Sequence, residues 1–125
     1  MQINTDKLET SLQDLKGILK DGLLAVAIWD SSTGLALAEI NPQPAGVALF
    51  NELTGVIQST LAGSGFPGLR RYYFLDLEAD HSIFLLRHGD DLLQGLLMNS
   101  SKANLGILLS VALPKMLASV QAARD

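Results

Sequence analysis

The segment AGVALFNELTGVIQSTL, residues 45–61, contains a single charged residue, Glu52, and so does the longer stretch 41–69. Its large apolar side chains recur at helical spacing on one side and extend well round the cylinder. A helix that covers one sheet needs a single apolar stripe with polar residues opposite. We therefore expect this helix to be covered twice, by its own sheet and by a second protein surface. The apolar side chains are Leu49, Phe50, Leu53, Val56, Ile57 and Leu61.

The bulk composition indicates one globular domain that spans residues 1–125. Hydrophobic residues make up 48% of the chain, which is enough for a sizeable core. The net charge of −4 and the pI near 5.0 argue against a nucleic-acid-binding protein, which needs a basic patch or stripe. The chain has no cysteine, which excludes disulfides and thiolate ligands or nucleophiles.

The sequence shows no targeting or membrane-spanning pattern. Its N-terminal residues lack a basic head followed by an apolar run. The longest uninterrupted apolar run, 23–29, is far shorter than the ~18 to 20 residues that a spanning helix needs. We therefore expect a cytoplasmic protein without membrane insertion.

Periodicity and turn residues predict an α+β fold, a two-sided sandwich in the order α-β-β-α-β-β-β-α. Asp6 and Glu9 have the spacing of a helix start. Asn99-Ser100-Ser101 offers capping chemistry for the last helix, which we expect to kink at Pro114. In that helix Leu105, Leu108, Leu109, Ala112, Met116 and Val120 should face the sheet. The predicted helices are 5–20, 45–61 and 102–122, and the predicted strands are 23–30, 35–40, 70–77, 81–88 and 92–98.

The strands differ in how polar they are. Strands 23–29 and 92–98 are apolar on both faces, which is typical of the middle of a sheet. Strands 35–40 and 70–77 are more polar, and we expect them at the edges, where another chain can pair.

No motif predicts a catalytic, metal or cofactor site. Residues 63–68 match G-x-G-x-x-G, but a dinucleotide site needs a strand before the motif and a helix after it, and the order here is reversed. His81 and His88 are seven residues apart on one strand, so they point to opposite faces, and we expect both to be solvated beside turns. His81 and its neighbours Asp80 and Ser82 diverge in space, unlike a triad. Asp90-Asp91 is typical of a solvated turn.

Together the element order, the hairpin that follows the first strand, and the run Met98-Asn99-Ser100-Ser101-Lys102-Ala103-Asn104-Leu105-Gly106 resemble the Roadblock family. This family includes the roadblock-type dynein light chains and the bacterial regulators of small Ras-like GTPases. The resemblance covers residues 6–120. It implies a five-stranded antiparallel sheet, with the first and last helices on one face and the middle helix on the other.

The resemblance also implies a homodimer in which the middle helices pack together and edge strands pair into one sheet. Carried over by position, the implied dimer interface combines residues of the middle helix with the strand segment 70–74. Its residues are Leu49, Phe50, Leu53, Val56 and Ile57 on the helix, and Arg70, Tyr72 and Phe74 on the strand. The implied function is non-catalytic: to bind and regulate a small Ras-like GTPase, or to scaffold a larger complex. Tyrosine and arginine at the edge strand agree with an interface.

One alternative is a PAS-like or profilin-like sensor of small molecules, which shares the layout of helices and sheet. It needs a pocket between the sheet and a helix, lined by residues such as Trp29 and Phe84. Trp29 ends a buried strand, so its ring can either close the core or line such a pocket. An enzyme is the third reading, and the sequence lacks the convergent acid, base and nucleophile that it requires.

Overall fold

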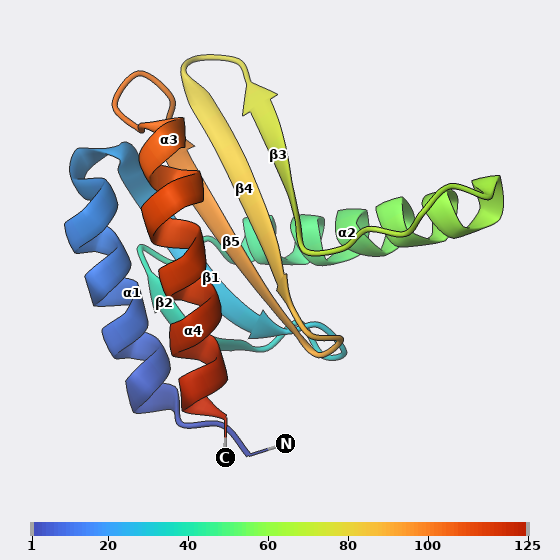
Figure 1. The fold of residues 1–125 in the computed structure, drawn as a ribbon, viewed down its shortest axis with the longest axis horizontal. Coiled ribbons are helices and arrows are strands. Elements are labelled where there is room, and N and C mark those ends of the chain that lie inside the picture. Colours follow the sequence, from blue (N-terminus) through green and yellow to red (C-terminus); the bar gives the residue numbers. More distant parts are fainter. Residues whose placement is uncertain (1, 125) are drawn as a thin grey trace.

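A five-stranded antiparallel sheet forms the centre of the fold (Figure 1). The computed structural model describes residues 2–124. The strands lie in the order β2-β1-β5-β4-β3, so the two apolar strands are internal and the two polar strands are edges, as predicted. The strands are β1 (Leu23–Asp30), β2 (Ala36–Ile40), β3 (Tyr72–Leu77), β4 (His81–His88) and β5 (Leu92–Asn99).

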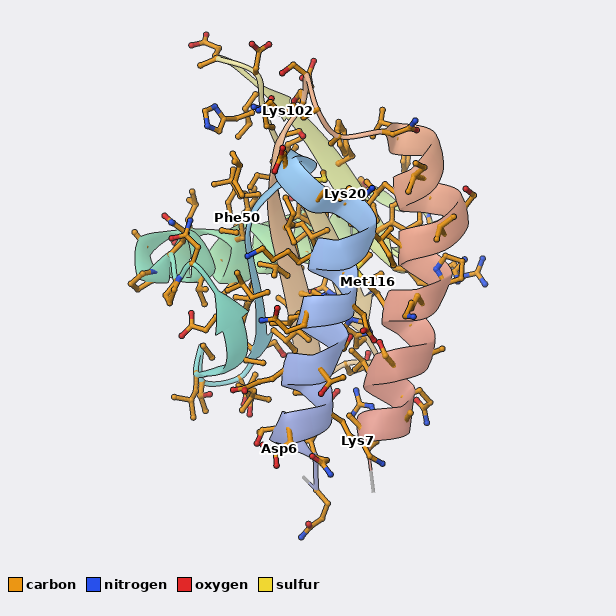
Figure 2. All side chains as sticks on the ribbon, turned by 90° about the vertical axis from the view of Figure 1, so that its left-hand side faces the viewer. Asp6, Lys7, Lys20, Phe50, Lys102 and Met116 are labelled. Atoms are coloured by element: carbon orange, nitrogen blue, oxygen red, sulfur yellow. The ribbon has the colours of Figure 1, made fainter. Side chains whose placement is uncertain are left out.

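Helices cover both faces of this sheet, which confirms the predicted sandwich (Figures 1 and 2). Helix α1 (Thr5–Leu19) and helix α4 (Leu113–Ala123) lie side by side on one face, joined by a hydrogen bond between the Ser11 and Ser119 hydroxyls at 2.7 Å. Helix α2 (Pro44–Ser64) crosses the other face alone. Each face therefore has its own core.

Helix α1 forms because four leucines recur on one face and are buried against the sheet: Leu8, Leu12, Leu15 and Leu19. Its cap is Asn4, whose side-chain oxygen accepts a hydrogen bond from the backbone N–H of Lys7 at 3.1 Å. The helix begins at Thr5 as predicted, but its cap is Asn4 and not Asp6, since Asn4 already satisfies a free amide of the first turn.

The last helix accommodates Pro114 through a wider, π-helical turn that precedes it. A three-residue helix α3 (Leu105–Ile107) leads into a π-helical turn, Leu108–Ala112, and then into α4. Pro114 cannot donate to the carbonyl of Ser110, and the wide turn before it relieves that loss. The extra residue rotates the first part of the helix, so Leu105 and Leu109 are exposed, against the prediction that they face the sheet. Leu108, Ala112, Met116 and Val120 are buried as predicted.

The predicted cap of this helix also lies too early. Asn99 accepts from the backbone N–H and hydroxyl of Ser101, at 3.0 and 2.7 Å, and so closes a turn instead of starting a helix. Asn104 is the actual cap, because its side-chain oxygen accepts from the backbone N–H of Ile107 at 3.1 Å. Gly22 packs against this connection, where a Cβ would come within 2.9 Å of the Ala103 Cα.

Among the described residues, one helix, Leu105–Ala123, has the length and composition that crossing a membrane requires. This helix contains no long uninterrupted apolar run, because polar residues such as Ser110 and Lys115 divide it, and it was therefore not expected from the sequence. On one side of it Leu108, Ala112, Met116 and Val120 belong to the core under α1. Its other apolar side chains are exposed, among them Leu105, Ile107, Leu109 and Val111, and 28% of the apolar window is buried.

The sheet separates two hydrophobic clusters. The larger cluster lies under α1 and α4 and contains Phe84, whereas the smaller lies under α2 and contains Trp29. A pocket lined by both rings, as the sensor alternative assumed, is therefore wrong. Neighbouring residues of a strand point to opposite faces, and the register across β1, β5 and β4 places these two rings on different sides.

His88 is buried under α4, which contradicts the expectation of a solvated histidine. Its Nε2 lies 2.8 Å from the Oε1 of Gln94, a fully buried side chain on β5. Burial lowers the pKa of His88 from its usual 6.5, and the positive charge of Arg124 adds to this, while Gln94 and Asp91 oppose it. The neutral ring is therefore the form that the folded chain accommodates.

The buried His88 predicts a loss of stability in mild acid. A histidine whose pKa is lowered by folding binds its proton more readily when unfolded, so the free energy of unfolding falls as the pH drops below about 6.5 and through the lower pKa of the folded state. Urea denaturation of the parent and of His88→Gln between pH 5 and 8 measures this. The variant should lose much of the dependence, and His81→Gln, the matched control, should keep it. Identical slopes for the parent and His88→Gln would contradict the prediction.

Candidate interaction surface

Helix α2 turns a polar stripe toward its own sheet. Asn51 is the first residue of this stripe, and its Oδ1 accepts a hydrogen bond from the indole N–H of Trp29 at 3.0 Å. Its Nδ2 donates to the carbonyl oxygen of Ser31 at 3.1 Å. One amide side chain therefore fixes the helix to the end of β1 and satisfies a buried indole.

Thr54 continues the stripe one turn later and is almost fully buried. Its hydroxyl donates to the carbonyl of Phe50 at 2.7 Å and lies 2.8 Å from the hydroxyl of Tyr73 on β3. Burial raises the pKa of Tyr73, against a smaller opposing effect of the Thr54 hydroxyl. Tyr73 thus stays a neutral phenol that ties α2 to the edge strand.

Gln58 is the last member of the stripe. With its amide oxygen turned toward Arg87 on β4, it accepts from Nη2 at 2.9 Å and from Nε at 3.0 Å. Arg87 also donates to the carbonyl of Leu69 at 2.6 Å, so it joins the helix to the loop that follows it. The stripe Asn51, Thr54 and Gln58 was present in the sequence at helical spacing and marks the face of α2 that packs on the sheet.

Because polar residues occupy the inner face, most apolar residues of α2 point elsewhere. Val47 and Thr54 are its only buried residues among those described. Leu49 and Val56 are 56% and 52% exposed, although the ordinary place for such side chains is a core. We call Leu49, Phe50, Leu53, Val56 and Ile57 the α2 surface; Phe50, Leu53 and Ile57 are half-buried. All five were predicted from the sequence as interface residues.

The C-terminal part of α2 extends past the edge strand β3 (Figure 1). Pro44 begins the helix, and Gly65, with φ of 77°, ends it in the left-handed conformation that glycine tolerates. Phe66 follows at this end and is 70% exposed. Sequence reasoning missed Phe66 because it treated residues 63–68 only as a loop.

The edge strand β3 divides its side chains between the two faces, so the predicted interface is not one continuous surface. Tyr73 and Leu75 pack with the cluster under α2. Tyr72 and Phe74 point to the opposite face, where the rings of Tyr72 and Phe84 lie 5.2 Å apart between centroids. Arg70 is exposed and precedes the strand. The exposed Leu77, which shares the α2 face, was missed, and strict alternation from Tyr73 would have found it.

A cleft of about 250 Å³ lies between the N-terminal half of α2 and the sheet. Trp29, Leu49, Phe50 and Leu77 are among its lining residues, and its walls are almost entirely apolar. The Trp29 ring therefore has both of the roles considered from the sequence, since it packs in the smaller core and also lines a cleft. Gly95 lies at the floor, where a Cβ would be 3.1 Å from the Trp29 ring.

The sequence motifs that resemble catalytic or cofactor-binding motifs do not form a site in the structure. Residues 63 and 64 end α2, and residues 65–68 lead towards β3, so the loop begins two residues later than the predicted 63–68. The order of helix before and strand after is as expected from the sequence, and it is the reverse of a dinucleotide site. Across residues 2–124, no group of three His, Cys, Asp or Glu side chains is placed to hold a metal ion. The α2 surface, the β3 edge and the apolar cleft are therefore the features to compare with known proteins.

Solved structures identify this architecture. MglB of Myxococcus xanthus superposes with a TM-score of 0.79 over 100% of this chain and 96% of that one, at 10% sequence identity. MglB in a tetrameric arrangement gives 0.74 over 94% and 90%, at 16% identity. A Roadblock/LC7 domain from Streptomyces avermitilis gives 0.60 over 86% and 88%, at 17% identity. The chain has the Roadblock/LC7 fold.

At these identities the likeness establishes the Roadblock/LC7 fold and leaves function to the surfaces of this chain. A profilin from Acanthamoeba castellanii is less similar, with a TM-score of 0.53 over 88% of this chain and 96% of that one, at 12% identity. No protein-family model and no curated protein matches the sequence.

The close approach of Gly95 to Trp29 predicts that Gly95→Val destabilises the chain. New methyl groups must displace the indole ring, and overpacking of this kind costs about 1 to 3 kcal/mol. Urea denaturation measures the loss. Gly17→Ala is the matched control, because nothing lies within 4 Å of its added Cβ in the last turn of α1, and it should stabilise by up to about 0.5 to 1 kcal/mol. Equal stability of Gly95→Val and the parent would contradict the packing of this site.

Proposed function

We propose that this chain is a non-catalytic, homodimeric regulatory or scaffolding module that binds a small Ras-like GTPase in the cytoplasm. The observation that carries the proposal is the outward apolar face of α2. Fully burying a large apolar side chain contributes about 1.5 to 3 kcal/mol. In the single subunit the α2 surface leaves Leu49 and Val56 more than half exposed, and its other three side chains are only half-buried. A second protein surface recovers this free energy.

The second copy of this chain fits that surface. In the proposed dimer the β3 strands pair edge to edge, and the sheet continues from one subunit into the other. The end of α2 that overhangs β3 then lies over the partner's sheet (Figure 1). There it meets the apolar cleft beside Leu49, Phe50 and Leu77, and Val56, Ile57 and Phe66 become buried. The cleft is in this proposal the seat of the partner's helix.

Two lines of reasoning support a GTPase as the external partner. The sequence resembles a family that includes bacterial regulators of small Ras-like GTPases, and the fold is that of MglB, which in Thermus thermophilus is described as a gliding protein. A dimer of this fold presents the outer surfaces of the helices that cover both faces of its sheet. Such a surface suits recognition of another protein.

A sensor of small molecules is the second candidate, and the apolar cleft is the observation that favours it. The cleft offers few polar side chains to orient a ligand, Asn41 and Gln43 among them. Native mass spectrometry of the purified protein separates the two functions. A copurified small molecule on a monomer supports the sensor, and a ligand-free dimer supports the regulatory module.

The proposed dimer predicts that Val56→Asp or Leu49→Asp converts the protein to a monomer. Each variant places a carboxylate in an apolar interface, where burying it unpaired is costly. Multi-angle light scattering at micromolar concentration measures the mass. Phe50→Asp and Ile57→Asp should act in the same direction, with added loss of stability because these residues are half-buried.

Leu35→Asp is the matched control for these variants. Leu35 lies in the turn between β1 and β2 and is 64% exposed, so the same chemical change is made outside the α2 surface. This variant should keep the dimer mass. A parent that runs as a monomer at micromolar concentration would refute the homodimer.

GTPase binding is tested with a small Ras-like GTPase from the same genome, chosen by its G-x-x-x-x-G-K-[ST] phosphate loop, and a gene beside this one that encodes such a protein would be the first choice. Coexpression and pull-down first test whether the two proteins form a complex. The purified chain is then titrated with the separately purified GTPase, loaded with GDP or with a non-hydrolysable GTP analogue. We expect binding that depends on the nucleotide, since small GTPases change their switch segments with it. Absence of binding in both nucleotide states would leave the scaffold and remove the GTPase from the proposal.

A further inference from the structure

All four arginines of the chain line one cleft, although the chain as a whole carries a net charge of −4. The cleft lies where β3 begins, β4 ends and α4 ends. The five lysines lie outside it, at residues 7, 16, 20, 102 and 115. Arginine has a planar fork that binds carboxylates in a bidentate manner, so the position of these four residues indicates an acidic counterpart.

Two of the four arginines already have acidic partners in the same subunit. Arg124 forms a bidentate pair with Asp91, at 2.9 and 2.7 Å, and its Nη2 also donates to the carbonyl of His88. Arg87 lies 3.3 Å from Asp90 and holds the loop through Leu69. These pairs lock the walls of the cleft.

Arg70 and Arg71 differ from them. Neither forms an ion pair with any residue between 2 and 124. The Nε of Arg71 is buried and makes no hydrogen bond within the described chain. Of these two, the exposed Arg70 is available to a partner at the N-terminal end of β3.

The opposite end of β3 is acidic. Asp76, Glu78 and Asp80 are all exposed, and none forms an ion pair within residues 2–124. The turn that holds Glu78 and Asp80 is tight, with positive φ at Ala79 and Asp80 of 58° and 57°. The edge strand is thus polarised, basic at one end and acidic at the other, and two such strands are complementary only when they run antiparallel.

The backbone of β3 fixes which residues can pair with a second copy. The N–H of Arg87 donates to the carbonyl of Arg71, so the odd-numbered residues of β3 bond to β4. In an antiparallel ladder the alternate residues point the other way, which leaves the N–H and C=O groups of Tyr72, Phe74 and Asp76 at the open edge. A twofold axis through Phe74 pairs all of these groups within the bounds of the strand.

We propose that two copies pair antiparallel about Phe74, with Arg70 of each copy opposite the partner subunit's Glu78. The inference rests on the proposed homodimer. It adds the register in which the two β3 strands pair and the opposite charges that select this register. Arg70 and Glu78 flank β3, and if its alternation is continued to both positions their side chains lie on the α4 face of the joined sheet. Arg70 does line the cleft beside α4.

Charge exchange tests the register. Arg70→Glu and Glu78→Arg each place like charges opposite one another twice in the homodimer, so each should weaken self-association by about tenfold or more. A mixture of the two variants should form a heterodimer with parental affinity, because both contacts again join opposite charges. The double variant Arg70→Glu with Glu78→Arg should also dimerise like the parent. Sedimentation equilibrium, with one copy tagged to identify heterodimers, measures all of these.

Glu39→Arg, a charge reversal on the other edge strand, is the matched control and should leave the dimer unchanged. The register is refuted if the parent dimerises and either single reversal does so equally well, or if the mixture stays monomeric. A monomeric parent refutes the homodimer itself, which is a different result. A far-UV circular dichroism spectrum of each single variant that matches the parent excludes misfolding as the cause of dissociation. The thermal midpoint itself should fall in a dissociated variant, because association contributes to the apparent stability.

Discussion

The hydrogen bonds of Asn51 decide how the whole α2 face is arranged. By joining the Trp29 indole and the Ser31 carbonyl to one side chain, Asn51 sets the rotation of the helix about its own axis. Thr54 and Gln58 hold the same rotation further along through Tyr73 and Arg87. Because the polar stripe is turned inward, most of the large apolar side chains of the helix lie on its outer side. Releasing these contacts would let it roll its apolar side onto the sheet, and the surface for a partner would be lost.

The two faces of the sheet consequently differ in how completely they are closed. Under α1 and α4 the packing is tight, with Phe84, Leu92 and Leu96 fully buried. Under α2 the cluster is smaller, and a cleft remains beside Trp29. Tight packing on one face supplies the stability of the single subunit. The incomplete face is free to be finished by another surface, and this division suits a module whose role is association.

Much of this could be predicted from the sequence, because the deciding signals are local. Apolar strands, turn residues and the leucine period of α1 predict the element order, the central strands and both edges. What failed depends on contacts between distant segments. The inward stripe of α2 was passed over because its partners Ser31, Tyr73 and Arg87 come from three separate strands or turns. His88 was expected in solvent since only the fold shows that α4 covers it. Tyr72 and Phe74 were grouped with the α2 surface before the register assigned them to the other face.

The two edges of the sheet also explain why association can stop at a closed pair. Strand β2 is five residues long, and Asn41 with positive φ, Pro42 and Pro44 follow it, so its ladder cannot be extended far. Strand β3 has an open backbone edge and self-complementary charge. If both edges could pair, β2 of one copy would join β3 of the next, and a head-to-tail contact of that kind propagates into a filament. With one edge blunted and the other matched only to itself, the proposed contact is isologous. It uses up the single open edge, so a third copy has no strand left to join.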